Sequence, residues 1–246
     1  MKTILVIGAS SDIGMAYIHN LEASQKENDV RVIAIYRTMS AKFMELVSSL
    51  KNILIETIQA DLSMPHDVAN MIDMIKQKKL HPTHILHLAA GKFQHMRIRD
   101  FDYNRTRLEM DIQVFSLAEI FKAFLPTMSK NQFGRVVVML TAYTIGIPPK
   151  FLTDYIVCKY ALLGLMKAAA AEYSHKGVCI NGVSPSMVET KFLDDLDSRV
   201  VEMTANDSPL KRNINVDEVV TAIEFLMSAD NSYMSGTNIN LSGGGR

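Results

Sequence analysis

The chain has 246 residues, its 26 Lys and Arg balance its 26 Asp and Glu, and 48% of its residues are hydrophobic. A chain of this length can bury roughly 70% of the surface that it exposes when unfolded, so it needs no disulfide or structural metal to fold. Zero net charge, with Lys and Arg scattered along the chain, argues against the clustered basic face that nucleic acid requires, and predicts no nucleic-acid partner.

The cysteines and the apolar stretches indicate the compartment. Cys158 and Cys179 are too few for a disulfide framework and are consistent with a reducing environment. The apolar run at 4–7 is shorter than the roughly 7 to 15 residues of a signal peptide. The longest apolar stretch, 161–171, is broken by Lys167 and falls short of the roughly 18 residues of a membrane span. We expect a soluble, cytoplasmic protein with no membrane partner.

In chain order, short apolar runs alternate with longer segments that have helical spacing. The runs predict strands at 4–7, 30–36, 53–58, 84–88, 135–140, 179–183 and 238–241, and the segments predict helices at 13–24, 41–50, 66–78, 107–128, 154–174 and 216–227. Several runs are nearly continuous in Val, Ile and Leu, as in parallel strands covered on both faces. The alternation predicts an α/β fold with one doubly wound, Rossmann-type parallel sheet of about seven strands. No linker divides the chain, so we expect a single domain over 1–246.

One segment interrupts this alternation. Residues 189–215 are polar and separate a predicted strand from the next helix by far more than the usual few residues. Such insertions are lids or disordered loops. The lid interpretation is favoured because the segment leaves the carboxyl end of a strand, where α/β proteins bind ligands.

A glycine-containing turn follows the first predicted strand. It comprises Gly8, Ser10, Ser11, Asp12, Ile13 and Gly14 around Ala9, and it opens directly into a helix. Glycine lets the chain turn sharply, the serines supply hydroxyl donors, and the free N–H groups of the helix start can hold a pyrophosphate. The alternative is an ordinary tight turn with Asp12 as N-cap. Its position between a strand and a helix favours nucleotide binding.

The second predicted strand ends at Tyr36 and Arg37. A dinucleotide site usually has an acidic residue here for the ribose 2′-hydroxyl, whereas an arginine pairs with a 2′-phosphate. No Asp or Glu occurs between Val30 and Lys42. NADP(H) is therefore favoured over NAD(H), and the alternative is a solvated surface arginine.

Three histidines follow at equal spacing, His81, His84 and His87. On a strand, residues three apart point to opposite faces, so His84 and His87 cannot share one ion. We expect structural roles for them and no metal site.

Tyr155 and Lys159 lie four residues apart in a predicted helix, so they share a face. A free tyrosine titrates near 10, and an adjacent cation lowers that pKa by stabilising the phenolate. The pair alone is commonplace, but together with a nucleotide-binding turn it becomes specific.

With this pair in place, the chain resembles the short-chain dehydrogenase/reductase family, in particular members similar to 3-oxoacyl-carrier-protein reductases. Asp61 and Leu62 look like the family's adenine-contacting position after the third strand, and Ala89, Ala90 and Gly91 look like its Asn-Ala-Gly turn after the fourth. The stretch 181–186 is similar to the family's Asn-x-Val-x-Pro-Gly stretch. Through it the resemblance assigns contacts with the nicotinamide half of the cofactor to Pro185, Val188 and Thr190.

The resemblance implies hydride transfer between a nicotinamide ring and a carbonyl or alcohol. Tyr155 would protonate the alkoxide as the carbonyl is reduced, and Lys159 would lower the pKa of Tyr155 and hold the nicotinamide ribose. An amide side chain on the helix at 107–128 would help to hold a proton-relay water, and it falls at Gln113 where the family has Asn. The protein supplies orientation and pKa tuning while the cofactor supplies the chemistry.

The family's catalytic Ser has no unambiguous counterpart. Counting forward from Gly134 and Arg135 leads to Thr141, whereas counting back from Tyr155 leads to Ala142. We favour Thr141, because strand registers shift less than loops and threonine can donate the same hydrogen bond. Asp12 also replaces a glycine of the family's turn, and its carboxylate would repel a phosphate placed too close.

These observations predict an NADP(H)-dependent oxidoreductase that reduces a ketone or β-ketoacyl-type carbonyl, free or tethered to a carrier, or oxidises the matching secondary alcohol. The alternative is a catalytically impaired member that acts as a nucleotide-binding or scaffolding partner. Family members commonly pair the apolar helix around 160–171 with its copy, so the resemblance also predicts a homodimer or homotetramer.

Overall fold

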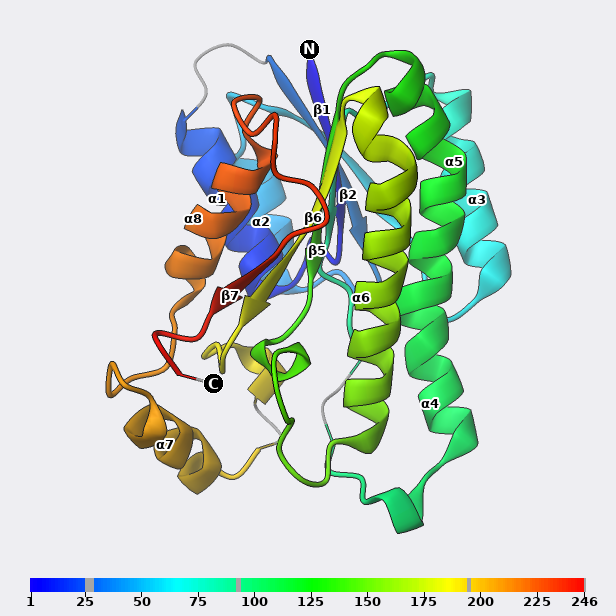
Figure 1. Cartoon of the computed structure of the whole chain (residues 1–246). Helices are drawn as coiled ribbons and strands as arrows, with labels where there is room; N and C mark the ends of the chain where they lie inside the picture. The colour runs from blue at the N-terminus through cyan, green and yellow to red at the C-terminus, as the bar shows by residue number, and fades with distance from the viewer. Residues whose placement is uncertain (25–28, 92–93, 194–195, 246) are drawn as a thin grey trace.

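A seven-stranded sheet organises the molecule. The computed structural model describes residues 1–24, 29–91, 94–193 and 196–245 (Figure 1). All strand pairs are parallel, in the order β3-β2-β1-β4-β5-β6-β7. The strands are β1 (Lys2–Ile7), β2 (Val30–Tyr36), β3 (Leu54–Gln59), β4 (His84–His87), β5 (Gly134–Met139), β6 (Val178–Pro185) and β7 (Asn238–Leu241). The expected doubly wound sheet is confirmed.

Helices cover both faces of the sheet (Figure 1). One layer holds α1 (Asp12–Ser24), α2 (Ala41–Ser49) and α8 (Val216–Met227), and the other holds α3 (Pro65–Gln77), α4 (Tyr103–Met110), α5 (Ser116–Lys130) and α6 (Thr153–Tyr173). The apolar strands explain this arrangement: Ile4 and Val6 of β1 enter one buried cluster, whereas Leu5 and Ile7 enter the other. A strand that must bury both faces needs helices on both sides.

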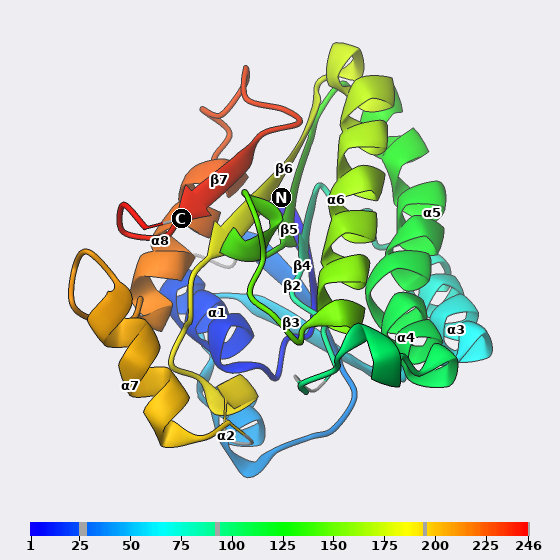
Figure 2. The ribbon, with the colours of Figure 1, turned by 60° about the horizontal axis from the view of Figure 1, so that its bottom comes forward.

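The strand order reverses between β1 and β4, which pair directly. In such sheets the connections on either side of the reversal leave in opposite directions and open a crevice at the carboxyl ends of the strands. Figure 2 brings that end forward and shows the turn into α1, the start of α6 and helix α7 (Ser198–Asp207) around it. The fold therefore gathers segments that are distant in sequence at one edge.

The helix expected at 107–128 is wrong in its continuity. Helix α4 begins earlier, at Tyr103, because the Asp102 side chain caps it by accepting the backbone N–H of Arg105 at 3.1 Å. A π-helical turn, η2 (Asp111–Phe115), then separates α4 from α5. A π-turn inserts one residue into the helical register, and such turns are frequent at functional sites.

The segment expected to form a lid contains regular structure. It carries η5 (Lys191–Leu193) and α7, which is capped by Asp197. Asp194 and Asp195, which also belong to the expected lid, lie outside the described residues. An isolated parallel bridge joins Val188 to Ile214 at the base of the segment. The remaining short helices are η1 (Ile98–Asp100), η3 (Ala142–Thr144) and η4 (Ser174–Lys176).

His84 and His87 lie on opposite faces of β4. His84 stacks edge-on against Phe133, with ring centroids 5.5 Å apart, on the side of α8. His87 faces α6, where the charge of Lys159 reaches it. Both side chains are buried, and within the described part of the chain no three potential metal-binding side chains cluster together.

Both cysteines are free and buried. Within the described residues, none of the helices combines the length and the apolar character that a membrane crossing requires.

Candidate active site

The turn after β1 is shaped by two close approaches. Gly8 has φ +84°, and a Cβ there would lie 3.1 Å from the backbone N of Ala89, so glycine is required. The Ser11 Oγ donates to the Gly8 carbonyl at 2.7 Å and accepts the Gly14 N–H at 3.1 Å. Ser11, not Asp12, therefore caps α1, and the N-cap interpretation of Asp12 is wrong.

A two-part cleft opens at the carboxyl ends of the strands. Its parts measure about 230 and 430 Å³, and they share Ser10, Ser11 and Arg37 in their walls. The larger part falls within the usual size of small-molecule sites. The expected site residues in the walls are Gly8, Ser10, Ser11, Asp12, Ile13, Arg37, Asp61, Leu62, Ala89, Ala90, Thr141, Tyr155, Lys159, Pro185, Val188 and Thr190.

Three expected site residues are not in the described lining of the cleft: Gly14, Gly91 and Gln113. Gly14 packs α1 against the turn, since a Cβ there would lie 2.7 Å from the Gly8 carbonyl oxygen. The Gly91 N–H donates to the Glu109 carboxylate at 3.0 Å, so this donor is not turned toward a ligand in the cleft.

Arg37 and Asp61 both line the smaller part of the cleft. Hydrogen bonds from the Ser63 hydroxyl, at 2.7 Å, and from its backbone N–H lower the pKa of Asp61, and the charge of Arg37 lowers it further. The side chain of Arg37 is exposed beyond the end of β2. Its guanidinium is therefore accessible to an anion at the rim.

The Tyr155 phenol meets the Thr141 hydroxyl in the larger part of the cleft. Burial raises the pKa of Tyr155 to about 12, the hydrogen bond with the Thr141 side chain opposes that rise, and the neighbouring Tyr143 adds to it. Thr141 lies two residues after the end of β5 and caps η3, of which Ala142 is the first residue. This geometry supports Thr141 over Ala142 as the hydroxyl position.

Lys159 lies behind this pair and is almost fully buried. Its Nζ donates to the Met139 carbonyl at 2.9 Å and lies 5.8 Å from the centroid of the Tyr155 ring. Burial lowers the pKa of Lys159 to about 8, and the charge of Glu109 opposes this shift. The amine can therefore exchange protons near neutral pH.

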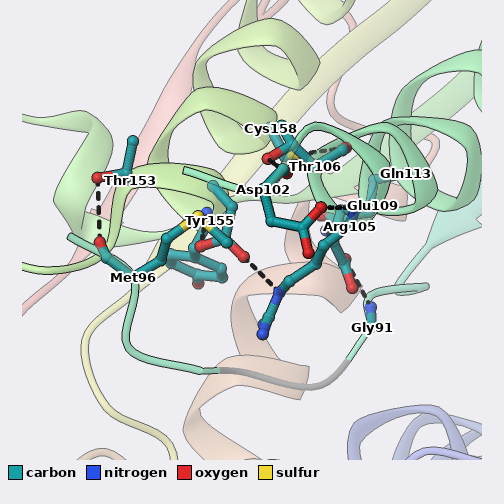
Figure 3. A network of polar contacts seen from close by, with 11 residues as sticks. Gly91, Met96, Asp102, Arg105, Thr106, Glu109, Gln113, Thr153, Tyr155 and Cys158 are labelled. Atoms are coloured by element: carbon teal, nitrogen blue, oxygen red, sulfur yellow. Dashed lines mark hydrogen bonds and ion pairs between the residues drawn. The ribbon is translucent and has the colours of Figure 1, made fainter. Parts of the chain in front are cut away.

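An ion pair of Arg105, which is labelled in Figure 3, with a buried carboxylate holds the start of α6 in place. The Asp154 Oδ2 lies 2.7 Å from the Arg105 Nε of α4, and the Asp154 Oδ1 accepts the Tyr155 N–H at 2.8 Å. Because Asp154 precedes Tyr155, the pair fixes the turn of helix that carries the phenol.

Sequence comparison gives the same assignment as this geometry. The family model described as "Enoyl-(Acyl carrier protein) reductase" matches residues 8–245. The chain belongs to the short-chain dehydrogenase/reductase family. A curated relative, the D-beta-hydroxybutyrate dehydrogenase of Rhizobium meliloti (strain 1021), is 23% identical over 258 aligned positions, gaps included. The alignment covers 99% of this chain and 98% of that protein.

Solved structures show the same fold. The 4-hydroxyisoleucine dehydrogenase complexed with NADH has a TM-score of 0.87 and 19% identity, covering 99% of this chain and 98% of that one. The 3-oxoacyl (acyl-carrier-protein) reductase of Agrobacterium tumefaciens C58 with NADP bound has a TM-score of 0.84 and 21% identity, covering 99% and 93%.

In this family member, Asp12 joins the turn after β1 to the segment after β6. Its Oδ2 accepts the backbone N–H of Lys191 at 2.8 Å, across 179 residues of sequence. The cleft is also lined by Tyr143 and by Phe192, Leu193 and Leu196, which motif spacing did not reveal. Tyr143 could have been suspected from its place two residues after Thr141, but the apolar residues follow no motif.

Proposed function

We propose that this protein is an NADP(H)-dependent reductase of a ketone or β-ketoacyl-type carbonyl, free or carrier-tethered, which also oxidises the matching secondary alcohol. The observation that carries the proposal is the hydrogen bond between the Thr141 hydroxyl and the Tyr155 phenol within the cleft, with Lys159 directly behind. A carbonyl oxygen held by both hydroxyls would be polarised by Thr141 and protonated by Tyr155.

The residues of the cleft fit a dinucleotide. The tight approach at Gly8, which leaves no space for a side chain, and the start of α1 form an anion cradle, and Arg37 lies at the far rim. The bound nicotinamide supplies or accepts the hydride. Burial raises the pKa of Tyr155, and the charge of Lys159, 5.8 Å from the ring centroid, would favour the phenolate when the phenol gives up its proton. The Lys159 amine also carries a mobile proton at Nζ.

The function is tested by incubating the purified protein with NADPH and a panel of ketones, β-ketoesters and β-ketoacyl thioesters. We expect oxidation of NADPH with at least one of them. Thr141→Ala is expected to lower kcat about 100-fold, because one hydrogen-bond donor to the developing oxyanion is lost, whereas Thr141→Ser retains the hydroxyl and most of the activity. Binding of NADPH without turnover across the panel would instead favour the impaired, scaffolding alternative.

The preference for NADP(H) rests on Arg37, since the solved relatives carry NADH in one case and NADP in the other. Arg37→Ala is expected to raise the KM for NADPH about 10- to 100-fold, because a charge-assisted hydrogen bond to the 2′-phosphate is lost. The KM for NADH, which has no 2′-phosphate, should be nearly unchanged. Lys42→Ala removes an exposed cation from α2 and serves as the control. Equal effects of Arg37→Ala on both cofactors would contradict the assignment.

We also propose that residues 1–246 act as one domain, with 189–215 as a substrate lid, in a cytoplasmic homodimer or homotetramer. The anchoring of the lid at Val188 and Ile214 supports its role. Exposed apolar side chains lie on the outer helices at Leu108, Phe115, Val157 and Tyr160. Burial of such a surface against a second copy is favourable, and sedimentation velocity that shows only monomer would contradict it.

A further inference from the structure

A buried carboxylate lies behind the cleft, on a residue that no family motif identifies. Glu109 of α4 is only 9% exposed. Its Oε2 accepts the Gly91 backbone N–H at 3.0 Å and the Gln113 Nε2 at 2.8 Å (Figure 3). Glu109 thus connects the turn after β4 to the π-helical turn that begins two residues later. A buried carboxylate is costly to desolvate, and these two N–H donors offset part of that cost.

The position of the Glu109 carboxylate is narrowly defined. A Cβ built on Gly91 would overlap Glu109 Oε1, so only glycine allows the carboxylate to lie against this turn. Because a carboxylate only accepts, the Gln113 amide must present its nitrogen to Glu109. Its Oε1 is then left buried, without a hydrogen-bond partner among the described residues. The carboxylate therefore determines how the Gln113 amide is oriented.

The charge of Glu109 acts on Lys159, which α6 presents from the other side. Burial lowers the pKa of Lys159 and the Glu109 charge raises it. Three other groups face Lys159. The pKa of Cys158 is raised to about 12 and that of His87 is lowered to about 3, so both are neutral at pH 7, as is the Tyr155 phenol. Among the described groups whose charge acts on Lys159, Glu109 is the carboxylate.

We propose that Glu109 is a positioning residue of the active site, whose carboxylate orients the Gln113 amide and the Gly91 turn and whose charge acts on the Lys159 ammonium. The task of that ammonium in catalysis rests on the proposed reductase function. The electrostatic influence of Glu109 on Lys159 does not depend on cofactor or substrate, so it can be measured in the cofactor-free protein.

The direct test is an NMR titration of the cofactor-free protein labelled at lysine Cε, with the Lys159 signal assigned by its loss in Lys159→Arg. In Glu109→Gln, the pKa of Lys159 is expected to fall by about one unit or more, because an opposing charge is removed. Glu109→Asp keeps the charge and should restore most of the shift. Asp111→Asn, which removes a carboxylate that is paired with Arg107 on the same helical stretch, serves as the matched control.

Activity provides a second readout. The alkaline limb of the pH profile of kcat should move to lower pH in Glu109→Gln, with the KM for NADPH little changed. If Glu109→Gln does not fold, Gly91→Ala displaces the carboxylate instead, and the same fall of the Lys159 pKa is expected. An unchanged Lys159 pKa in a folded variant, or equal falls in Glu109→Gln and Asp111→Asn, would overturn the proposal. If the wild type shows no turnover but the pKa of Lys159 still falls in Glu109→Gln, the reductase function is rejected and the action of Glu109 on Lys159 is supported.

Discussion

Replacing Tyr155 by phenylalanine is expected to lower kcat for carbonyl reduction by about 10²- to 10⁴-fold, the usual contribution of a positioned acid. The phenol is the group in the cleft that meets the Thr141 hydroxyl and lies over Lys159, and phenylalanine keeps its shape while removing the proton. Binding of NADPH, measured by calorimetry, should be nearly unchanged. The experiment therefore separates proton transfer from cofactor binding.

Tyr160→Phe is the matched control for this variant. Tyr160 lies on the same helix, but it is exposed, and its hydroxyl donates to the Gly146 carbonyl over a long distance of 3.4 Å. Its kcat should equal that of the wild type. Retention of activity by Tyr155→Phe in an otherwise intact protein would assign the acid to another group and would remove the basis for the proposed mechanism.

Acidification is expected to lower the free energy of unfolding steeply, through His84 and His87. Burial lowers the pKa of both side chains from 6.5 to about 3, and nearby positive charges act in the same direction: Lys2 and Arg135 at His84, and Lys159 at His87. The unfolded chain binds these protons at about pH 6.5 and the folded chain does not. The stabilisation is therefore complete above about pH 6.5 and is lost as the pH falls toward 3.

Below about pH 6.5, each unit of acidification lowers the free energy of unfolding by about 1.4 kcal/mol per histidine. The pair should lower the free energy of unfolding by about 3 kcal/mol between pH 7.5 and 5.5, measured by urea denaturation. His87→Leu should remove about half of this loss. His81→Gln, which changes the exposed member of the same run, should leave it unchanged. If the free energy of unfolding falls equally steeply with pH in the wild type and in His87→Leu, His87 is not a source of the loss.

Three expected elements were confirmed to the residue: strands β2 and β7 and helix α8. Helix α8 begins where Asn215 and Glu218 form a reciprocal capping box, a local signal. The long helix at 107–128 was wrong because a π-turn inserts a residue without changing the apolar composition. Local signals are reliable where the structure is decided by neighbouring residues.

In the candidate site, too, local sequence predicted some residues and tertiary packing decided others. Motif order placed Gly8, Arg37, Tyr155 and Lys159, and all four line the cleft. Counting along the chain left Thr141 and Ala142 as alternatives, since one residue of uncertainty in the loop after β5 changes which side chain reaches Tyr155. Such a choice depends on how the loop packs, and not on local spacing.

The sequence by itself determined the doubly wound sheet, the glycine-containing turn between β1 and α1, and the placing of Tyr155 and Lys159 on one helix, because each follows from periodicity or from a short spacing. Only the tertiary structure decided that Thr141 meets Tyr155, that Asp12 accepts the Lys191 N–H, and that the Glu109 carboxylate lies between Gly91 and Gln113. Contacts of this kind join separate segments, so they depend on the path of the chain and on which face each side chain takes, and neither can be read from local sequence.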